Sequence, residues 1–277
     1  MRVAVITDST ACIPAEHAAQ WHIGVVDVQL RVGDRIDDER RFERETIIEQ
    51  LRAGAHVSTS PPDPGAFFWT YQDAVSSGAE AIVSLHISGK MSATGEAARQ
   101  AAQQIRVPVY VIDSGTTGMS LGFAALSAAR TAEAGGDAQR VVEAAQRRFA
   151  LSHELIYVDT LEYLRRGGRI GGAAAMLGTA LSVKPLLTVT GGEVAPLARV
   201  PGTKRALAKL VELAVRQAGN QPVDIAISAA AAGERQFALR RELEQRMPAP
   251  RQIIDVSAST VIGAHVGPNA LGITVAP

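Results

Sequence analysis

Apolar and polar residues alternate in blocks along the first half of the chain. Short apolar runs, such as residues 3–6 and 81–85, end in small polar residues and precede segments with helical spacing of apolar positions. In residues 137–150, Val141 and Ala145 fall on one helical face. Strands that alternate with helices in this way are typical of an open, mainly parallel α/β sheet.

The pattern predicts a series of elements for this half. The expected strands are residues 3–6, 23–30, 81–85 and 107–112. The expected helices are residues 14–20, 44–52, 65–74, 95–104, 119–134 and 137–150. The charged residues 34–42 are expected to form a solvated turn or hairpin, and the Pro-rich residues 57–64 a loop.

The second half, from about Ser152, mixes hairpins with helices. Its expected strands are residues 155–158, 183–190, 193–200, 223–228, 253–256 and 271–275. Its expected helices are residues 203–218 and 234–246, a short turn over 259–264, and a buried, almost wholly apolar helix over 173–181. Gly191 and Gly192 predict a hairpin between two of the strands. The fold predicted is therefore α/β with two α/β domains, residues 1–152 with a mainly parallel sheet and residues 153–277 with a mixed one.

Composition excludes several classes of protein. The chain has 28 basic and 28 acidic residues and only 4% aromatic residues, which argues against a nucleic-acid-binding protein. The single cysteine, Cys12, cannot form an internal disulfide, so we expect a reducing, cytoplasmic environment. The first residues read as a strand rather than a signal peptide, and no apolar window reaches the roughly 18 residues of a membrane span.

Common catalytic signatures are absent from the sequence. It has no phosphate-binding loop of the Walker type, no dinucleotide fingerprint, no nucleophile elbow and no His or Cys spacing typical of a metal site. We therefore expect a binding protein without its own catalytic motif, metal or cofactor, rather than an enzyme.

Residues 87–94 place hydroxyls where a strand turns into a helix. Backbone N–H groups at a helix start lack intrahelical partners, and the helix dipole favours an anion there. A serine in this position, Ser88 or Ser92, is also an ordinary helix cap. Taken locally, the stretch is either a capped helix start or a seat for a carboxylate or phosphate.

Several segments in a fixed order carry a resemblance that extends over nearly the whole chain. They are residues 7–10, 59–65, 87–94, 111–114, 158–171, 184–185 and 265–272. The run Asp-Thr-Leu-Glu-Tyr-Leu-Arg-Arg-Gly-Gly-Arg-Ile-Gly at 159–171 is the most specific of them. This set resembles the DegV family, which includes the fatty-acid-binding subunits of bacterial fatty acid kinase.

The resemblance implies two α/β domains with one long-chain fatty acid between them. It also implies a separate kinase subunit as partner, which phosphorylates the bound acid to an acyl phosphate that feeds phospholipid synthesis. Transient contact with a membrane for lipid exchange is compatible with this function. No nucleic acid is implied as partner.

The family's motifs carry over to particular residues of this sequence. They imply that the carboxyl group is bound by Thr59, Ser92 with the backbone N–H of Ala93, and His265. From its charge alone, we expect Arg169 to contact a phosphate or the kinase subunit. Candidates for lining the acyl chain are Phe67, Met91, Met119, Leu121 and the helix expected at 173–181. For each residue a structural role is the alternative: a turn hydroxyl at Thr59, a core or loop histidine at His265, a solvated basic loop at Arg169, and plain core packing for the apolar side chains.

Two departures from the family pattern bear on function. Ala93 stands where the family commonly has Gly, and Pro201 interrupts a segment where the family often has a basic residue, although Arg199 or Lys204 can substitute. A lipid carrier or regulatory protein without kinase coupling is therefore one alternative. An acyl or phosphoryl transferase that uses Asp8, Asp113 and Ser92 is another.

Overall fold

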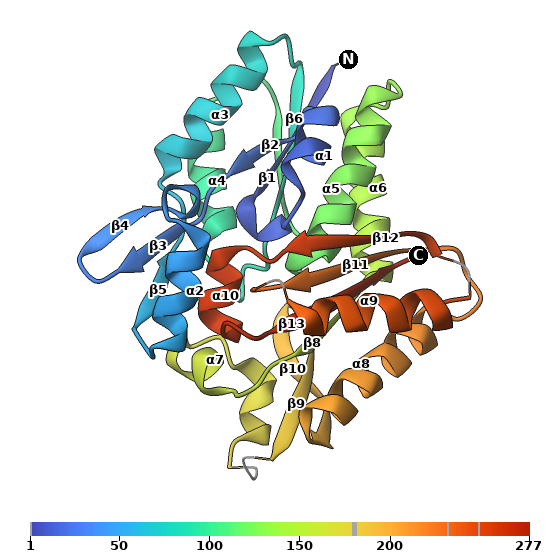
Figure 1. The fold of residues 1–277 in the computed structure, drawn as a ribbon. Helices are drawn as coiled ribbons and strands as arrows, with labels where there is room; N and C mark the ends of the chain where they lie inside the picture. Colours follow the sequence, from blue (N-terminus) through green and yellow to red (C-terminus); the bar gives the residue numbers. More distant parts are fainter. Residues whose placement is uncertain (1, 179–181, 232, 249) are drawn as a thin grey trace.

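The computed structural model describes residues 2–178, 182–231, 233–248 and 250–277. Its first sheet has the strand order β2-β1-β6-β7, with all neighbours parallel. The strands are β1 (Val3–Asp8), β2 (Gly24–Val26), β6 (Ala81–His86) and β7 (Val109–Asp113). The helices of this region are α1 (Ala15–Gln20), α3 (Pro64–Ser76), α4 (Thr94–Ala102), α5 (Gly118–Glu133) and α6 (Ala138–Leu151). Helices α3 and α4 cover one face of the sheet and α5 and α6 the other (Figure 1).

The second sheet has the order β10-β9-β8-β13-β11-β12, and only the pair β11 and β12 is parallel. Its strands are β8 (His153–Tyr157), β9 (Val183–Thr190), β10 (Glu193–Pro201), β11 (Val223–Ala229), β12 (Pro250–Ser257) and β13 (Leu271–Ala276). Helices α8 (Thr203–Ala218) and α9 (Glu234–Arg246) pack on one face. The predicted α/β fold, with a parallel first sheet and a mixed second one, is confirmed.

A small antiparallel sheet of order β4-β3-β5 lies beside these two. It consists of β3 (Gln29–Val32), β4 (Arg35–Asp38) and β5 (Val57–Ser60), and it is accompanied by α2 (Arg44–Arg52) and by α10 (Thr260–Val266) from the far end of the chain. Figure 1 shows α2 and α10 side by side.

Two predictions fail in this region. Residues 23–30 are not one strand, because the chain leaves the first sheet after β2 and enters the small sheet at β3. Residues 57–60 form a strand rather than a loop, because their backbone pairs with β3. Val57 is the one apolar residue of β5, so the sequence showed no alternation of apolar and polar positions there, and all four residues are half-buried in the structure.

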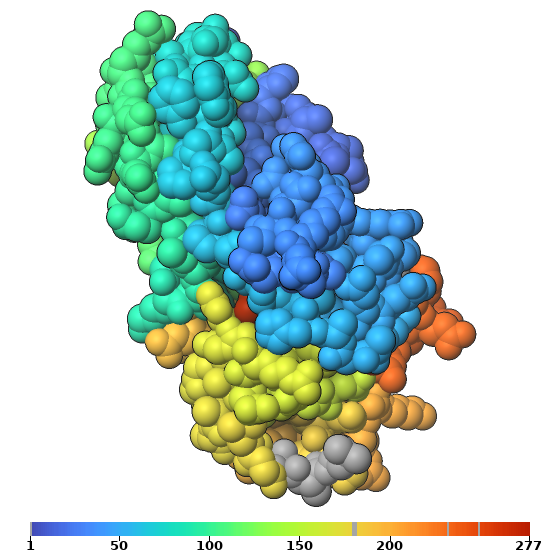
Figure 2. Space-filling view, turned by 90° about the vertical axis from the view of Figure 1, so that its left-hand side faces the viewer, coloured from blue at the N-terminus to red at the C-terminus, as the bar shows by residue number. Residues whose placement is uncertain are grey.

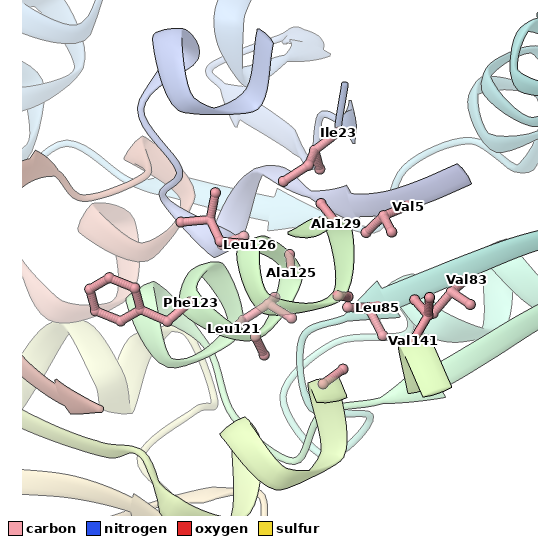
Figure 3. Packing of buried hydrophobic residues seen from close by; sticks show 14 of the residues in the cluster. Val5, Ile23, Val83, Leu85, Leu121, Phe123, Ala125, Leu126, Ala129 and Val141 are labelled. Atoms are coloured by element: carbon pink, nitrogen blue, oxygen red, sulfur yellow. The ribbon is translucent and has the colours of Figure 1, made fainter. Parts of the chain in front are cut away.

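Helix α5 lies between the two large sheets. Its buried side chains join a core that contains Val5 and Val83 of the first sheet together with Ala226 and Val256 of the second. Figure 3 shows Leu121, Ala125 and Ala129 of this helix packed toward the strands that carry Val5, Val83 and Leu85. Because this core is continuous between the halves, the boundary between residues 152 and 153 stays a prediction.

The apolar helix predicted over residues 173–181 is wrong in the part that the structure describes. Residues Gly171–Met176 form a short 3₁₀ helix, in which Ala173 and Met176 are buried, and Leu177 is 47% exposed. Residues 179–181 lie outside the described part. Gly171, Gly172 and Gly178, together with the alanines at 173–175, give residues 171–178 little side-chain surface to bury, so their apolar composition does not produce a buried α-helix. Within the described residues, no helix combines the length and apolar character needed to cross a bilayer.

Candidate functional site

A cavity of about 620 Å³, counted with its open mouth, lies where the small sheet, the loop after β6 and the second sheet meet. Figure 2 shows a small dark-red area, the colour of the C-terminal segment, in the crevice between the blue and yellow parts of the surface. The cavity is lined by Thr10, Val28, Thr59, Ile87, Met91, Ser92, Thr117, Ile156, Leu164, Arg169, Val189, Val194, Val261, Ile262, His265 and Val266.

Thr59 and His265 form a hydrogen-bonded pair in this cavity. Thr59 Oγ1 lies 2.8 Å from His265 Nε2. Strand β5 holds Thr59 opposite Leu30 of β3, and helix α10 carries His265. The helix start is fixed by Glu39, which accepts hydrogen bonds from Ser259, Thr260 and the backbone of Val261. The fold thus brings together two predicted site residues that are far apart in the sequence.

The imidazole of His265 is neutral at physiological pH. Burial, and secondarily the positive charge of Arg169, lower its pKa to about 4. A neutral ring has one donor and one acceptor nitrogen, and Nδ1 has no hydrogen-bond partner within the described part of the chain. His265 therefore contributes a hydrogen bond rather than a charge.

Gly167 allows His265 to occupy this position. A Cβ atom on Gly167 would lie 2.1 Å from His265 Nδ1, which no side chain can tolerate. The glycine is therefore required by close approach of the imidazole, since the φ of Gly167 is −75° and suits any residue. This explains one residue of the Gly-Gly-Arg run in physical terms.

Of the two serines in the loop after β6, Ser92 faces the cavity. Its hydroxyl lies 2.8 Å from Thr94 Oγ1 and accepts a hydrogen bond from Thr94 N at the start of α4. Ser88 is buried and donates to the carbonyl of Gly192 in the β9–β10 hairpin. Ala93 is exposed and is not among the lining residues.

Arg169 connects the two sides of the cavity mouth. Its Nε donates to the carbonyl of Met91, and its Nη1 donates to the carbonyl of Gly167. It also borders a second hollow lined by His56, Tyr163 and Arg166, so its guanidinium stands between the cavity and the outer surface. Arg166 differs, since it is exposed and paired with Glu162.

The residues expected to line an acyl chain separate into two groups. Met91 lines the cavity. Phe67 packs edge-on against His86 at a centroid distance of 5.0 Å in the core beneath α3, and Met119 and Leu121 lie in the core around α5. All three are fully buried against neighbouring elements and do not line this cavity, so their contact with an acyl chain stays a prediction.

Several lining residues were not anticipated. Ile156 and Val189 come from β8 and β9, Val194 from β10, and Ile262 and Val266 from α10. Strand alternation puts Ile156 on the face opposite Leu155 and Tyr157, which pack toward α8. Alternation in the sequence separates the two faces of the strand, but it does not show which face borders a cavity.

The carboxylates of Asp8 and Asp113 are occupied by hydrogen bonds that fix loops. Asp8 is fully buried and accepts from Thr10 N, Ile87 N and the imidazole of His86. Asp113 accepts from Gly89 N and Gly115 N.

Asp8, His86 and Ser84 are connected by hydrogen bonds in the same order as the Asp, His and Ser of a hydrolase triad. His86 Nδ1 lies 3.0 Å from Asp8 Oδ2, and His86 Nε2 lies 2.7 Å from Ser84 Oγ. All three residues are fully buried, so no substrate reaches them.

The fold and the cavity define a class: a two-sheet α/β protein with a largely apolar cavity that is polar at its mouth. The model of the DegV family, described as an uncharacterised protein family, matches residues 2–277. A DegV domain-containing protein of Streptomyces coelicolor is 44% identical over 99% of this chain and 98% of its own length. One from Deinococcus radiodurans is 37% identical over 100% of this chain and 99% of its own. The chain belongs to the DegV family.

Solved structures agree with this assignment. A DegV family protein from Thermus thermophilus, described for its fatty acid binding, superposes with a TM-score of 0.93 at 30% identity, covering 100% of this chain and 99% of that one. DegV from Bacillus subtilis, described as a fatty acid binding protein, gives a TM-score of 0.90 at 28% identity over 100% and 99% of the two chains.

Proposed function

We propose that this protein binds a long-chain fatty acid, with the carboxyl group at Thr59, Ser92 and His265 and the acyl chain in the apolar cavity. The observation that carries the proposal is the Thr59–His265 pair at the mouth of a cavity whose other lining is mostly aliphatic. The fatty acid binding described for the two solved relatives supports it.

The chemistry of the mouth suits a carboxyl group. Hydroxyls can donate to a carboxyl oxygen, and a buried carboxylate needs several such partners. Arg169 supplies a positive charge at the same place, which favours the ionised acid. The chain contributes most of the affinity, since each buried methylene is worth about 0.8 kcal/mol. The backbone N–H of Ala93, at the start of α4, is a further donor in this proposal.

The protein's role is to present the bound acid to a separate kinase subunit, which forms an acyl phosphate for phospholipid synthesis. The family resemblance supports this role. So do the hydrogen bonds that Asp8 and Asp113 accept from loop residues, because a transferase would need these two carboxylates for its chemistry. Arg169, between the cavity and the outer surface, is the residue that contacts the phosphate or the kinase subunit. The cytoplasmic location and a transient membrane contact for lipid exchange belong to the same proposal.

A carrier without kinase coupling is the second candidate. Strand β10 ends at Pro201, and Arg199 donates to the carbonyl of Ala175 at 2.5 Å. Of the two basic residues that could replace the family's residue here, Arg199 is therefore engaged within the protein, and Lys204 remains as the exposed cation at the start of α8.

Native mass spectrometry of the purified protein tests the binding function. We expect a mass increase that matches one long-chain fatty acid, or its appearance on addition of palmitate or oleate. Protein that is empty as purified and binds neither acid would contradict the proposal.

Acyl phosphate formation with the kinase subunit tests the coupling. Arg169→Glu should abolish it, whereas Arg166→Glu, three residues earlier in the chain, should not. Mass spectrometry of bound fatty acid in both variants separates a loss of phosphorylation from a loss of binding. Unchanged acyl phosphate formation in Arg169→Glu would remove Arg169 from this role, and its absence in the unaltered protein would favour the carrier.

A further inference from the structure

Next to the apolar cavity lies a second, smaller space that contains polar groups. The two spaces share Thr117, Ile156, Ile262 and Val266 in their linings, so they adjoin at these side chains. The inner space is further lined by Cys12, Gly118, Glu154, Ser228, Ala230, Ala258, Ala270, Leu271 and Gly272. A channel built only for a hydrocarbon chain would have no need for a carboxylate and two hydroxyls at its inner end.

Strand register explains how the polar groups meet there. Glu154 and Ile156 are two residues apart on β8, so both side chains lie on the same face of the sheet. Gly272 of β13 pairs with Ile156 on one side and with Ser228 of β11 on the other, which puts Ser228 on that face too. Gly272 has no side chain, and a Cβ atom there would lie 2.3 Å from Ser228 Oγ, so the missing side chain makes room for the hydroxyl of Ser228.

Glu154 is only 5% exposed and is held by two hydrogen bonds. Ser120 N, in the first turn of α5, and Thr274 Oγ1 both donate to Oε1, at 2.7 and 2.8 Å. Gly118 lets the carboxylate lie close to the helix start, since a Cβ atom there would come within 3.4 Å of Oε2. Both of these bonds end on Oε1, and the side chain of Ser120 interacts with the carboxylate as well, since it acts to lower the pKa of this group.

Thr117 adds an unsatisfied hydroxyl. Its Oγ1 is buried and has no hydrogen-bond partner among the residues that the structure describes. Buried polar groups are nearly always hydrogen-bonded, so an orphan hydroxyl in the wall of a channel indicates a partner supplied by the ligand or by a water that the ligand can displace.

We propose that this inner end selects fatty acids that carry a hydroxyl group on the distal part of the chain, with Glu154 and Thr117 as its hydrogen-bond partners. The inference rests on the proposed binding of the carboxyl group at the outer end. The ligand hydroxyl donates to Glu154 Oε2 and accepts from Thr117 Oγ1, while Ser228 lies across the same space. A plain hydrocarbon end offers neither bond and desolvates both groups without compensation.

The ionisation of Glu154 is compatible with either direction of this bond. Burial raises the pKa of its carboxyl group to about 7, against the opposing effect of the hydrogen bonds from Ser120 and Thr274. At neutral pH the group is therefore available both as an acceptor and, when protonated, as a donor to the ligand oxygen.

Binding measurements with matched ligands test the inference. Dissociation constants are compared for stearate and for hydroxystearates with the hydroxyl at successive positions from mid-chain to the terminal carbon. We expect one positional isomer to bind the unaltered protein about tenfold more tightly than stearate, as one well-made buried hydrogen bond allows. Thr117→Val and Glu154→Gln should remove most of this preference, and stearate should bind Thr117→Val more tightly than the unaltered protein, because it no longer buries an unpaired hydroxyl.

The variants are chosen so that a folding defect does not hide the answer. Thr117→Val keeps the side-chain shape and breaks no hydrogen bond of the described protein, and Glu154→Gln keeps an oxygen for Ser120 and Thr274. Thr131→Val, on the outer part of α5, is the matched control and should keep the full preference. If stearate binds and every hydroxystearate binds more weakly, or if Thr117→Val and Glu154→Gln keep the preference, this inference is overturned while the proposed function stands. If neither stearate nor any hydroxystearate binds, the proposed function fails as well.

Discussion

Thr59 Oγ1 and His265 Nε2 lie 2.8 Å apart across 206 residues of sequence. The pair joins the small sheet to helix α10, so the polar mouth of the cavity exists only when both ends of the chain are folded together. Thr59 lies in β5, which was not predicted as a strand, and His265 lies in α10, which was predicted only as a helical turn.

Removal of the Thr59 hydroxyl should weaken fatty acid binding. Thr59→Val keeps the shape of the side chain but can neither donate to a carboxyl group nor bond to His265. We expect about a tenfold loss of affinity for palmitate, the equivalent of one hydrogen bond. A fluorescence displacement titration measures it. Thr46→Val, on the exposed part of α2, is the control, and equal affinities in both variants would move the carboxyl site away from Thr59.

A methyl group on Gly167 should displace His265. The added Cβ of Gly167→Ala would lie 2.1 Å from Nδ1, so the imidazole must leave its place beside Thr59. Gly168→Ala is the matched control, because Gly168 has a φ of +68° but no atom near its would-be Cβ. Both variants should lose stability, the second by about 1 kcal/mol from backbone strain, but only Gly167→Ala should also lose fatty acid binding. Normal binding by folded Gly167→Ala would show that His265 is not needed there.

Glu154 should make the stability of the protein fall as the pH rises. Burial raises its pKa from 4.5 to about 7, so the folded protein binds more protons than the unfolded chain between these values. The free energy of unfolding therefore decreases through this window, by about 3 kcal/mol in all. Urea unfolding at pH 4.5 and pH 8 should show a smaller decrease in Glu154→Gln. Glu143→Gln, on the exposed part of α6, should behave like the unaltered protein. A slope unaffected by Glu154→Gln would mean that the carboxylate is ionised throughout.

Asp8 should act on stability rather than on chemistry. Asp8→Ala leaves Thr10 N, Ile87 N and His86 without their buried acceptor, and we expect a loss of about 3 kcal/mol or more in the free energy of unfolding. The exposed Asp34→Ala should cost little. Denaturant unfolding measures both. If Asp8→Ala were as stable as Asp34→Ala yet inactive in acyl phosphate formation, the transferase alternative would regain support.

The sequence predicted only part of the set of residues that form the cavity. The family pattern pointed to Thr59, Ser92 and His265, and charge pointed to Arg169; the structure brings these four together around one cavity. The acyl-chain residues that the sequence also suggested, Phe67, Met119 and Leu121, do not line this cavity, and their role stays a prediction. An apolar residue in a strand-helix pattern fills a core more often than a cavity, and local sequence contains nothing that distinguishes the two.

The sequence by itself determined the elements whose pattern is local. The buried run of β6, the amphipathic helix α8 and the hairpin at Gly191 and Gly192 each follow from periodicity or turn chemistry over a few residues, and all occur as predicted. The ordered set of segments that includes the run at 159–171 likewise indicated the family, which the family model confirms over residues 2–277.

Only the tertiary structure decided which polar groups share a cavity. Strand β5 forms because its backbone pairs with β3. His265 can take its position because Gly167 has no side chain. Glu154 lies where it does because the strand register pairs it with Thr274. These relationships join residues far apart in the chain, and their free energy comes from packing and from hydrogen bonds that form only when distant segments meet. A local pattern contains no information about such contacts, so they had to be seen in the folded molecule.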